Sequence, residues 1–289
     1  MGWAHAGAVE QSAERLDAAA DVKAAACICW QEGCMLARST SRAIVTDRCA
    51  SLGCSVCRGI DSAIKQELER LARVRRYAAG ETVFGEEEEI PFVGNVVSGV
   101  LRMQKTIPDG RQQIVGLLVP SDMFGRVFSH RSQVSIEAAT PVTLCCYSRR
   151  AFEALLGRFP ALEHRMLLSI LDELDAAQDW MMLLGCQTVM ERVATFLLIV
   201  RGRSPGLSAP APNRPTSYEI EVPINRRDMA AYLGTTAESI SRSIQEMARQ
   251  GVLRIADACH FEILNERQLI WLSGRGEAER RPERQLLIA

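Results

Sequence analysis

Between residues 76 and 147 the chain consists of short apolar and β-branched runs separated by turn residues such as Gly80, Gly99 and Pro108. These runs predict strands at 82–84, 93–97, 100–106, 113–118, 134–138 and 142–147. Many short strands with turn signals between them are typical of an antiparallel roll or barrel. Just ahead of this segment, residues 61–73 place apolar side chains at helical spacing and predict a short helix.

Beyond Pro160 the apolar period changes to that of helices. One stripe advances in steps of four and three residues, close to the spacing of a coiled-coil seam, through Met166, Ile170, Leu174, Ala177, Met181 and Leu184. Such a helix either packs on its own β-rich domain or pairs with a second copy of itself, and its length favours the second. Residues 187–200 predict another amphipathic helix. The proline-rich residues 201–217 predict a loop, and 218–223 a strand.

Two short helices with a tight turn between them follow this strand. The first begins at Asn225, a suitable N-cap residue, and ends at a glycine after about two turns. The second begins at Thr235, because Thr235 and Glu238 have the spacing of a capping box, and Gly251 ends it. Two helices joined in this way form a helix-turn-helix, whose second helix enters the major groove of DNA.

The second helix has an apolar and a polar face. The apolar face, predicted to be buried, holds Ala237, Ile240, Ile244 and Met247. The candidate DNA-contacting residues are Thr236, Glu238, Ser241, Arg242 and Gln245, with Arg249 on the same stripe. Arg242 can donate to both major-groove acceptors of a guanine, and Glu238, one turn earlier, can accept from a cytosine amino group. Solvation alone would also explain polar residues there. Residues 254–258 and 260–263 are β-prone and predict a wing.

Composition narrows the class of protein. The 289 residues are 47% hydrophobic and 24% charged, as in a globular protein with room for two domains. The apolar runs fall short of the about 18 residues that a membrane-spanning helix needs, and no signal-peptide pattern is recognisable. We therefore expect a cytoplasmic protein with no membrane partner. The four histidines are scattered and no nucleophile–base pair is recognisable, so we do not expect an enzyme. A net charge of −1 leaves DNA binding dependent on the helix-turn-helix.

Six of the ten cysteines lie in the alanine-rich first 57 residues. In a reducing compartment, clustered cysteines bind metal or respond to redox state more often than they form disulfides. Cys49, Cys54 and Cys57 stand within nine positions of one another. A site with four thiolates, for an iron–sulfur cluster or for zinc, would need one more cysteine from elsewhere in the chain.

The segment LGTTAESISRSIQEM, with Glu238, Ser241 and Arg242 in a Glu-x-x-Ser-Arg pattern, resembles the recognition helix of the Crp/Fnr family, and of its Fnr/FixK branch in particular. The order of parts over residues 50–270 is similar as well. This resemblance implies an α+β fold with a cyclic-nucleotide-binding-like β-roll, a long dimerisation helix and a winged helix-turn-helix. It also implies a transcription regulator that binds double-stranded DNA as a homodimer at a TTGAT-N4-ATCAA-like palindrome and contacts RNA polymerase.

The family pattern and the predicted elements together divide the chain into five parts. These are an Ala/Cys-rich extension at 1–57, a sensory β-roll at 58–158, a dimerisation helix at 159–186, a winged helix-turn-helix domain at 187–272 and a polar tail at 273–289.

The resemblance leaves three interpretations of the sensory part. Cyclic-nucleotide sensors of this fold are similar in a Gly-Glu pair and a later Arg-Ser/Thr-Ala. Here Asp122 stands in place of a clear Gly-Glu pair, and Arg131 and Ser132 are followed by Gln133. Fnr proteins instead resemble this chain in an N-terminal cysteine cluster and a central cysteine late in the β-roll, where Cys145 stands. A cluster-free FixK-like regulator is the third interpretation.

The resemblance to Fnr implies an oxygen-responsive or redox-responsive 4Fe–4S cluster. Its four implied thiolate ligands are Cys49, Cys54, Cys57 and Cys145. Cys27, Cys29 and Cys34 are alternative ligands, with Cys29 and Cys34 the first choices to replace Cys54, because the spacing in this chain differs from the usual Fnr spacing. The remaining central and C-terminal cysteines, Cys146, Cys186 and Cys259, are expected to be ordinary thiols.

Overall fold

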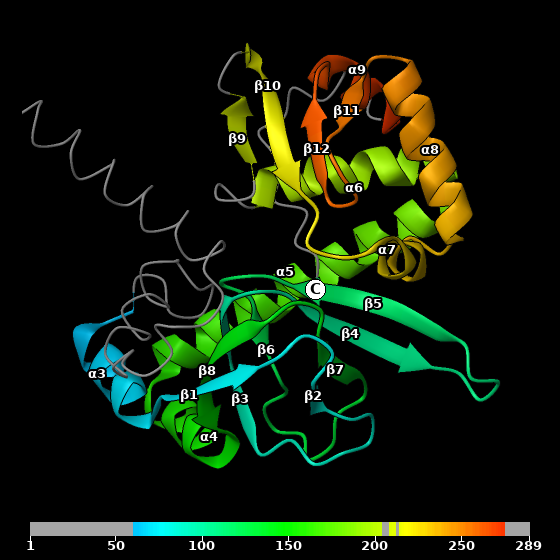
Figure 1. Cartoon of the computed structure of the whole chain (residues 1–289). Helices are drawn as coiled ribbons and strands as arrows, with labels where there is room; N and C mark the ends of the chain where they lie inside the picture. The colour runs from blue at the N-terminus through cyan, green and yellow to red at the C-terminus, as the bar shows by residue number, and fades with distance from the viewer. Residues whose placement is uncertain (1–59, 204–207, 212–213, 275–289) are drawn as a thin grey trace, which may run out of the picture. The chain divides into compact units, whose positions relative to one another are not determined.

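The structure is a computed structural model that describes residues 60–203, 208–211 and 214–274 (Figure 1). Its N-terminal part is the predicted β-roll. Two four-stranded antiparallel sheets have the strand orders β1-β8-β3-β6 and β2-β7-β4-β5. The strands are β1 (Arg73–Tyr77), β2 (Thr82–Phe84), β3 (Phe92–Ser98), β4 (Leu101–Thr106), β5 (Gln112–Leu118), β6 (Met123–Phe124), β7 (Ser135–Ala138) and β8 (Val142–Ser148). The sequence pattern did not predict β1 or β6.

Three helices accompany the roll. The predicted first helix is α3 (Ser62–Leu71), which Asp61 caps by accepting the N–H of Ala63 at 3.4 Å. Helix α4 (Arg149–Arg158) directly follows β8 and was not predicted. The long helix is α5 (Pro160–Cys186), with its proline in the first turn, where a missing N–H costs nothing.

Strand β8 separates two apolar cores, because successive side chains of a strand point to opposite faces. Leu144 and Cys146 belong to the core inside the roll, with Phe84, Phe92 and Phe124. Cys145 and Tyr147 belong to the core outside it. This outer core also contains Leu68 of α3, Phe152 of α4, and Leu162 and Met166 of α5. One strand therefore links the interior of the roll to the start of the long helix.

Helix α5 has one buried and one exposed apolar face. Five residues pack inward: Leu162, Met166, Ser169, Ala176 and Leu183. Large apolar side chains on the other side are exposed, namely Leu167, Leu168, Ile170, Leu171, Leu174, Met181 and Met182. The predicted stripe thus combined both faces, since Met166 is buried while Ile170, Leu174 and Met181 are exposed. The exposed face also includes Leu167 and Leu171, which the stripe omitted.

The C-terminal part contains the helix-turn-helix. Its elements are α6 (Val189–Arg203), β9 (Ser208–Ala211), β10 (Arg214–Glu221), α7 (Arg226–Tyr232), α8 (Ala237–Arg249), β11 (Leu253–Ile255), β12 (His260–Ile263) and α9 (Glu266–Leu272). The four strands form one antiparallel sheet in the order β11-β12-β10-β9. The prediction of a loop over 201–217 was wrong: α6 extends to Arg203, and β9 and the start of β10 occupy the proline-rich segment. Helix α9 was not predicted.

Within the described ranges, every helix is too short or too polar to cross a membrane.

The close packing of β3 against β8 gives a stability prediction. A Cβ atom built on Gly94 would lie 2.2 Å from the carbonyl oxygen of Cys145, whereas one on Gly157 of α4 meets nothing within 4 Å. We expect Gly94→Ala to lower the free energy of unfolding by about 2 kcal/mol or more. Gly157→Ala should raise it, by up to about 1 kcal/mol, because alanine favours the helix. Urea denaturation of the purified variants measures both, and equal stability of the two variants would contradict this packing.

Candidate DNA-recognition site

The first helix of the helix-turn-helix is fixed by its cap and its turn. The Asn225 side-chain oxygen accepts the N–H groups of Arg227 and Asp228, each at 2.9 Å, so the predicted N-cap is confirmed. At the other end Gly234 has a φ of 61°, in the left-handed region that glycine adopts without strain. This residue lets the chain turn sharply into α8.

The second helix begins one residue later than predicted. Its N-cap is Thr236, whose hydroxyl accepts the N–H of Ser239 at 3.2 Å, so the capping box at Thr235 and Glu238 was wrong. Among the hydrogen bonds of the described residues, the Glu238 carboxylate therefore does not cap the helix. It accepts from the guanidinium of Arg242 instead. The buried face is nearly as predicted. Ile240, Ile244 and Met247 are buried, but Ala237 is exposed and Ser243 takes the fourth buried position.

The polar face of α8 brings the predicted reading residues together. The side chains of Glu238 and Arg242 are 71% and 76% exposed and form an ion pair of 2.5 Å across one helical turn. Between them, Ser241 donates its hydroxyl to the carbonyl of Ala237 at 2.9 Å, so its oxygen stays available as an acceptor. Thr236, at the N-cap, and Gln245, one turn after Arg242, are also exposed. The Glu238 and Arg242 groups can exchange their mutual contact for complementary groups on neighbouring base pairs.

The predicted wing is the hairpin of β11 and β12 beside α8. Its turn is held by Asp257, which accepts the N–H groups of Cys259 at 2.8 Å and His260 at 2.9 Å. The backbone hydrogen bond from Cys259, followed by the side-chain and backbone hydrogen bonds from His260, lowers the pKa of Asp257 to about 2. The first wing strand is shorter than predicted, because it ends at Ile255.

An aromatic contact attaches α7 to the two preceding helices. Tyr232 at the end of α7 is fully buried. Its ring stacks on Trp180 of α5 with centroids 4.2 Å apart, and it meets the edge of Phe196 of α6 at 5.9 Å. The helix-turn-helix is therefore packed directly on the C-terminal half of the long helix.

Arg192 of α6 fixes the same junction through backbone carbonyls. Its guanidinium donates to Leu184 at 2.6 Å and Gln187 at 2.9 Å, at the end of α5. It also donates to Leu233 at 2.9 Å, at the end of α7. A cation at the C-terminal ends of two helices is favourable, because their last carbonyls carry partial negative charge. Sequence reasoning missed Arg192, since a lone arginine in an apolar helix has no distinctive spacing.

The sensory candidates fall partly on described residues. Cys145 is fully buried, in the outer core that α3, α4 and the start of α5 share. Burial raises the pKa of Cys146 to about 12, so this thiol, inside the roll, is neutral at physiological pH. The other predicted ligands, Cys49, Cys54 and Cys57, lie outside the described residues. In the part that the structure describes, no three His, Cys, Asp or Glu residues gather as a metal site would require.

The residues considered for nucleotide binding make contacts of their own. The Arg131 guanidinium donates to the backbone carbonyl of Glu87 at 3.0 Å. The Ser132 hydroxyl is part-buried and donates to the carbonyl of Val134. The Arg131 side chain thus holds the loop between β6 and β7 against the segment between β2 and β3, while the Ser132 hydroxyl bonds within that loop. The acidic run 86–89 in that segment is exposed.

A β-roll followed by a long helix and a winged helix-turn-helix with an exposed reading face defines a class of DNA-binding transcription regulators. Residues 74–159 match the model of the cyclic nucleotide-binding domain, and residues 191–270 match the model of the Crp-like helix-turn-helix domain. The chain belongs to the Crp/Fnr family, as a DNA-binding regulator of the Fnr/FixK type.

Two relatives and one solved structure illustrate the similarity. The chain is 36% identical over 220 residues to the transcriptional activator protein FnrL of Cereibacter sphaeroides, covering 76% of this chain and 88% of FnrL. It is 37% identical over 207 residues to the nitrogen fixation regulation protein FixK of Bradyrhizobium diazoefficiens, covering 72% and 85%. The structure of FixK2 from Bradyrhizobium japonicum aligns with a TM-score of 0.64 at 32% identity, covering 70% of this chain and 96% of that one.

The polar face of α8 gives a prediction about base reading. Arg242→Ala should cost about 1–3 kcal/mol at one guanine of the binding site and relax the preference at that base pair. Arg111→Ala is the matched control, because Arg111 is an equally exposed arginine in an ion pair, with Asp109 at 2.7 Å, but lies in the β4–β5 turn of the roll. Fluorescence anisotropy with a set of single-base variants of a TTGAT-type palindrome measures the change. The assignment fails if Arg242→Ala binds every variant as the unchanged protein does.

Proposed function

We propose that the protein is a homodimeric transcription activator whose two recognition helices read a TTGAT-N4-ATCAA-like palindrome and whose DNA-bound form contacts RNA polymerase. The observation that carries this proposal is the exposed face of α8. There Glu238 and Arg242 stand in ion contact with Ser241 between them, in the Glu-x-x-Ser-Arg order that resembles the Fnr/FixK branch. The similarity to FnrL, a transcriptional activator protein, supports the direction of regulation.

The exposed apolar face of α5 supports a dimer. Leu167, Leu171, Leu174 and Met181 follow one another at steps of four, three and seven residues, which is the spacing of a coiled-coil seam. Full burial of one such side chain is worth about 1.5–3 kcal/mol, so a row of them exposed to water favours association. A second copy of α5 offers a matching face. Association through this helix would place two reading faces on one DNA molecule.

The dimer proposal predicts the effect of a single charge on that face. Leu174→Glu or Ile170→Glu should shift the protein toward the monomer, because each would bury a carboxylate in an apolar seam. Palindrome affinity should fall with it, since two half-sites are no longer held by one particle. Analytical ultracentrifugation measures the assembly state. Ala161→Glu, exposed in the first turn of the same helix, is the control that should remain dimeric.

For the sensory part we propose a 4Fe–4S cluster held by Cys145 with Cys49, Cys54 and Cys57. The position of Cys145 supports this choice over Cys146. Cys145 belongs to the core that also contains Ile64 and Leu68 of α3, and Ile60 packs against that core. Only two residues separate Ile60 from Cys57, so the chain can bring Cys57 near this face within about 10 Å of Ile60. Cys146 faces the opposite side of β8, inside the roll.

When bound, such a cluster would supply the oxygen-sensitive group of the regulator. Residues of this chain would couple the cluster to formation of the dimer. Cys145 shares its core with Leu162 and Met166 of α5, so a change in how Cys145 is held would alter the packing of the first turns of the dimer helix.

The cluster proposal predicts a pattern of cysteine variants. Cys145→Ser should abolish bound iron as fully as Cys57→Ser does, because a cluster that lacks one of its four thiolates is readily lost. Cys146→Ser and Cys186→Ser should retain it. Iron and sulfide analysis of protein purified without oxygen measures this. If the unchanged protein holds no iron and still binds the palindrome in air, the cluster-free FixK-like regulator takes the place of this proposal.

A further inference from the structure

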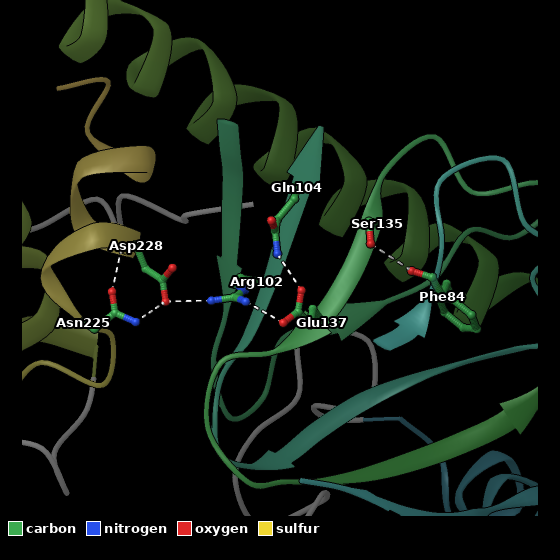
Figure 2. Close-up of polar contacts among 7 residues, drawn as sticks. All are labelled: Phe84, Arg102, Gln104, Ser135, Glu137, Asn225 and Asp228. Carbon is green, nitrogen blue, oxygen red and sulfur yellow. Dashed lines mark hydrogen bonds and ion pairs between the residues drawn. The ribbon is translucent and has the colours of Figure 1, made fainter. Parts of the chain in front are cut away.

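Arg102 on β4 lies between two carboxylates that belong to different parts of the chain (Figure 2). One guanidinium nitrogen contacts Asp228 of α7 at 2.7 Å, and the other terminal nitrogen contacts Glu137 of β7 at 2.5 Å. The three side chains are only 20%, 13% and 22% exposed, in the order Arg102, Asp228, Glu137. At this burial the charges are screened far less than those of a surface pair.

Each carboxylate has a second donor from its own side. Gln104 of β4 donates to Glu137 at 3.1 Å, and Asn225, the N-cap of α7, donates to Asp228 at 3.0 Å (Figure 2). The two acids therefore share one guanidinium, and each keeps a neutral partner beside it. Arg102 and Glu137 are also direct neighbours in the pairing of β4 with β7, so their contact belongs to the roll alone.

The contact with Asp228 is part of a larger junction between the roll and the helix-turn-helix. The side-chain amide of Gln113 on β5 donates to the carbonyl of Tyr232 at 3.5 Å. Val100, Ile114 and Leu117 of the roll belong to the same apolar core as α7 and α8. The reading face of α8 remains exposed in this arrangement. The junction therefore orients the recognition helix without covering it.

We propose that Arg102 is a positioning residue that latches α7 to the β-roll, and that this latch is built to open. In the open form Arg102 retains the counter-charge of Glu137, and Asp228 retains the hydrogen bond from the neutral side chain of Asn225. The roll is therefore not left with the buried, unpaired charge that is the usual cost of breaking such a contact. Glu137 and Asp228 compete for the positive charge of the single Arg102 guanidinium. The latch gives the roll a direct hold on the orientation of the recognition helix, independently of the palindrome and of the cluster proposed above.

Competition for one cation has a consequence that ordinary packing does not have. Asp228→Asn should weaken the latch, because a neutral amide replaces the charged acceptor on α7. Glu137→Gln should strengthen it, because Arg102 then faces only the carboxylate of Asp228. The two substitutions are equally conservative in shape and lie on either side of the same guanidinium. They should therefore change the docking of α7 in opposite directions.

Hydrogen–deuterium exchange of the full-length protein, followed by mass spectrometry of peptides covering α7, tests this without DNA. We expect about tenfold faster exchange of α7 in Asp228→Asn and slower exchange in Glu137→Gln. Arg102→Ala should match Asp228→Asn, and it alters no residue of α7 or of its cap. Arg111→Ala is the control, since Arg111 pairs with Asp109 in the exposed turn between β4 and β5 and should leave α7 unchanged.

Peptides covering β8 should exchange at the same rate in all four variants, which shows that the roll is intact. If Asp228→Asn and Glu137→Gln shift the exchange of α7 in the same direction, or if Arg102→Ala leaves it unchanged, the latch is wrong. The proposed palindrome and cluster would be unaffected by that result.

Discussion

Tyr232 brings helices α5, α6 and α7 into contact, and its burial fixes α7 of the helix-turn-helix against the other two. Its ring lies between Trp180 of the long helix and Phe196 of α6, and its own backbone ends α7. Aromatic pairs of this kind add about 0.5–1.5 kcal/mol to the stabilisation from area alone. Arg192 then joins the carbonyl ends of α5 and α7 at the same place. Any rotation of the end of α5 is therefore passed to the helix-turn-helix through a dense, directional contact.

The β-roll contacts helices α5 and α7 through residues on different strands. From β8, the outward face packs on the first turns of α5, while β4 and β5 contact α7 through Arg102 and Gln113. The first contact acts on the part of α5 that precedes its exposed apolar face, and the second acts on the reading domain within one chain. Under the proposed function, these two contacts would let the roll adjust assembly and the orientation of the reading helix separately, because they share no residue.

Features that depend on neighbouring residues could be predicted from the sequence, whereas features that depend on residues far apart in the chain could not. The cap at Asn225 and the exposed face of α8 are decided within one or two helical turns, so their residues alone indicate them. Strand β1 was missed because three of its five residues are arginines, and it is recognisable as a strand only beside β8. The apolar period of α5 could not show that Met166 packs inward, since the period does not identify the partner. Arg102 and Asp228 are 126 positions apart, and nothing in either segment points to the other.

The ion pair on the recognition helix also bears on how the protein finds its site. Long-range attraction to DNA depends on unbalanced positive charge that displaces counterions from phosphates. Here the exposed Arg242 is balanced by Glu238, and the whole chain carries a net charge of −1. We therefore expect random DNA to attract this surface weakly and to hold it only briefly. Such a charge arrangement favours a search by repeated brief encounters with DNA. Contact lasts only where base edges replace the ion pair of Glu238 and Arg242.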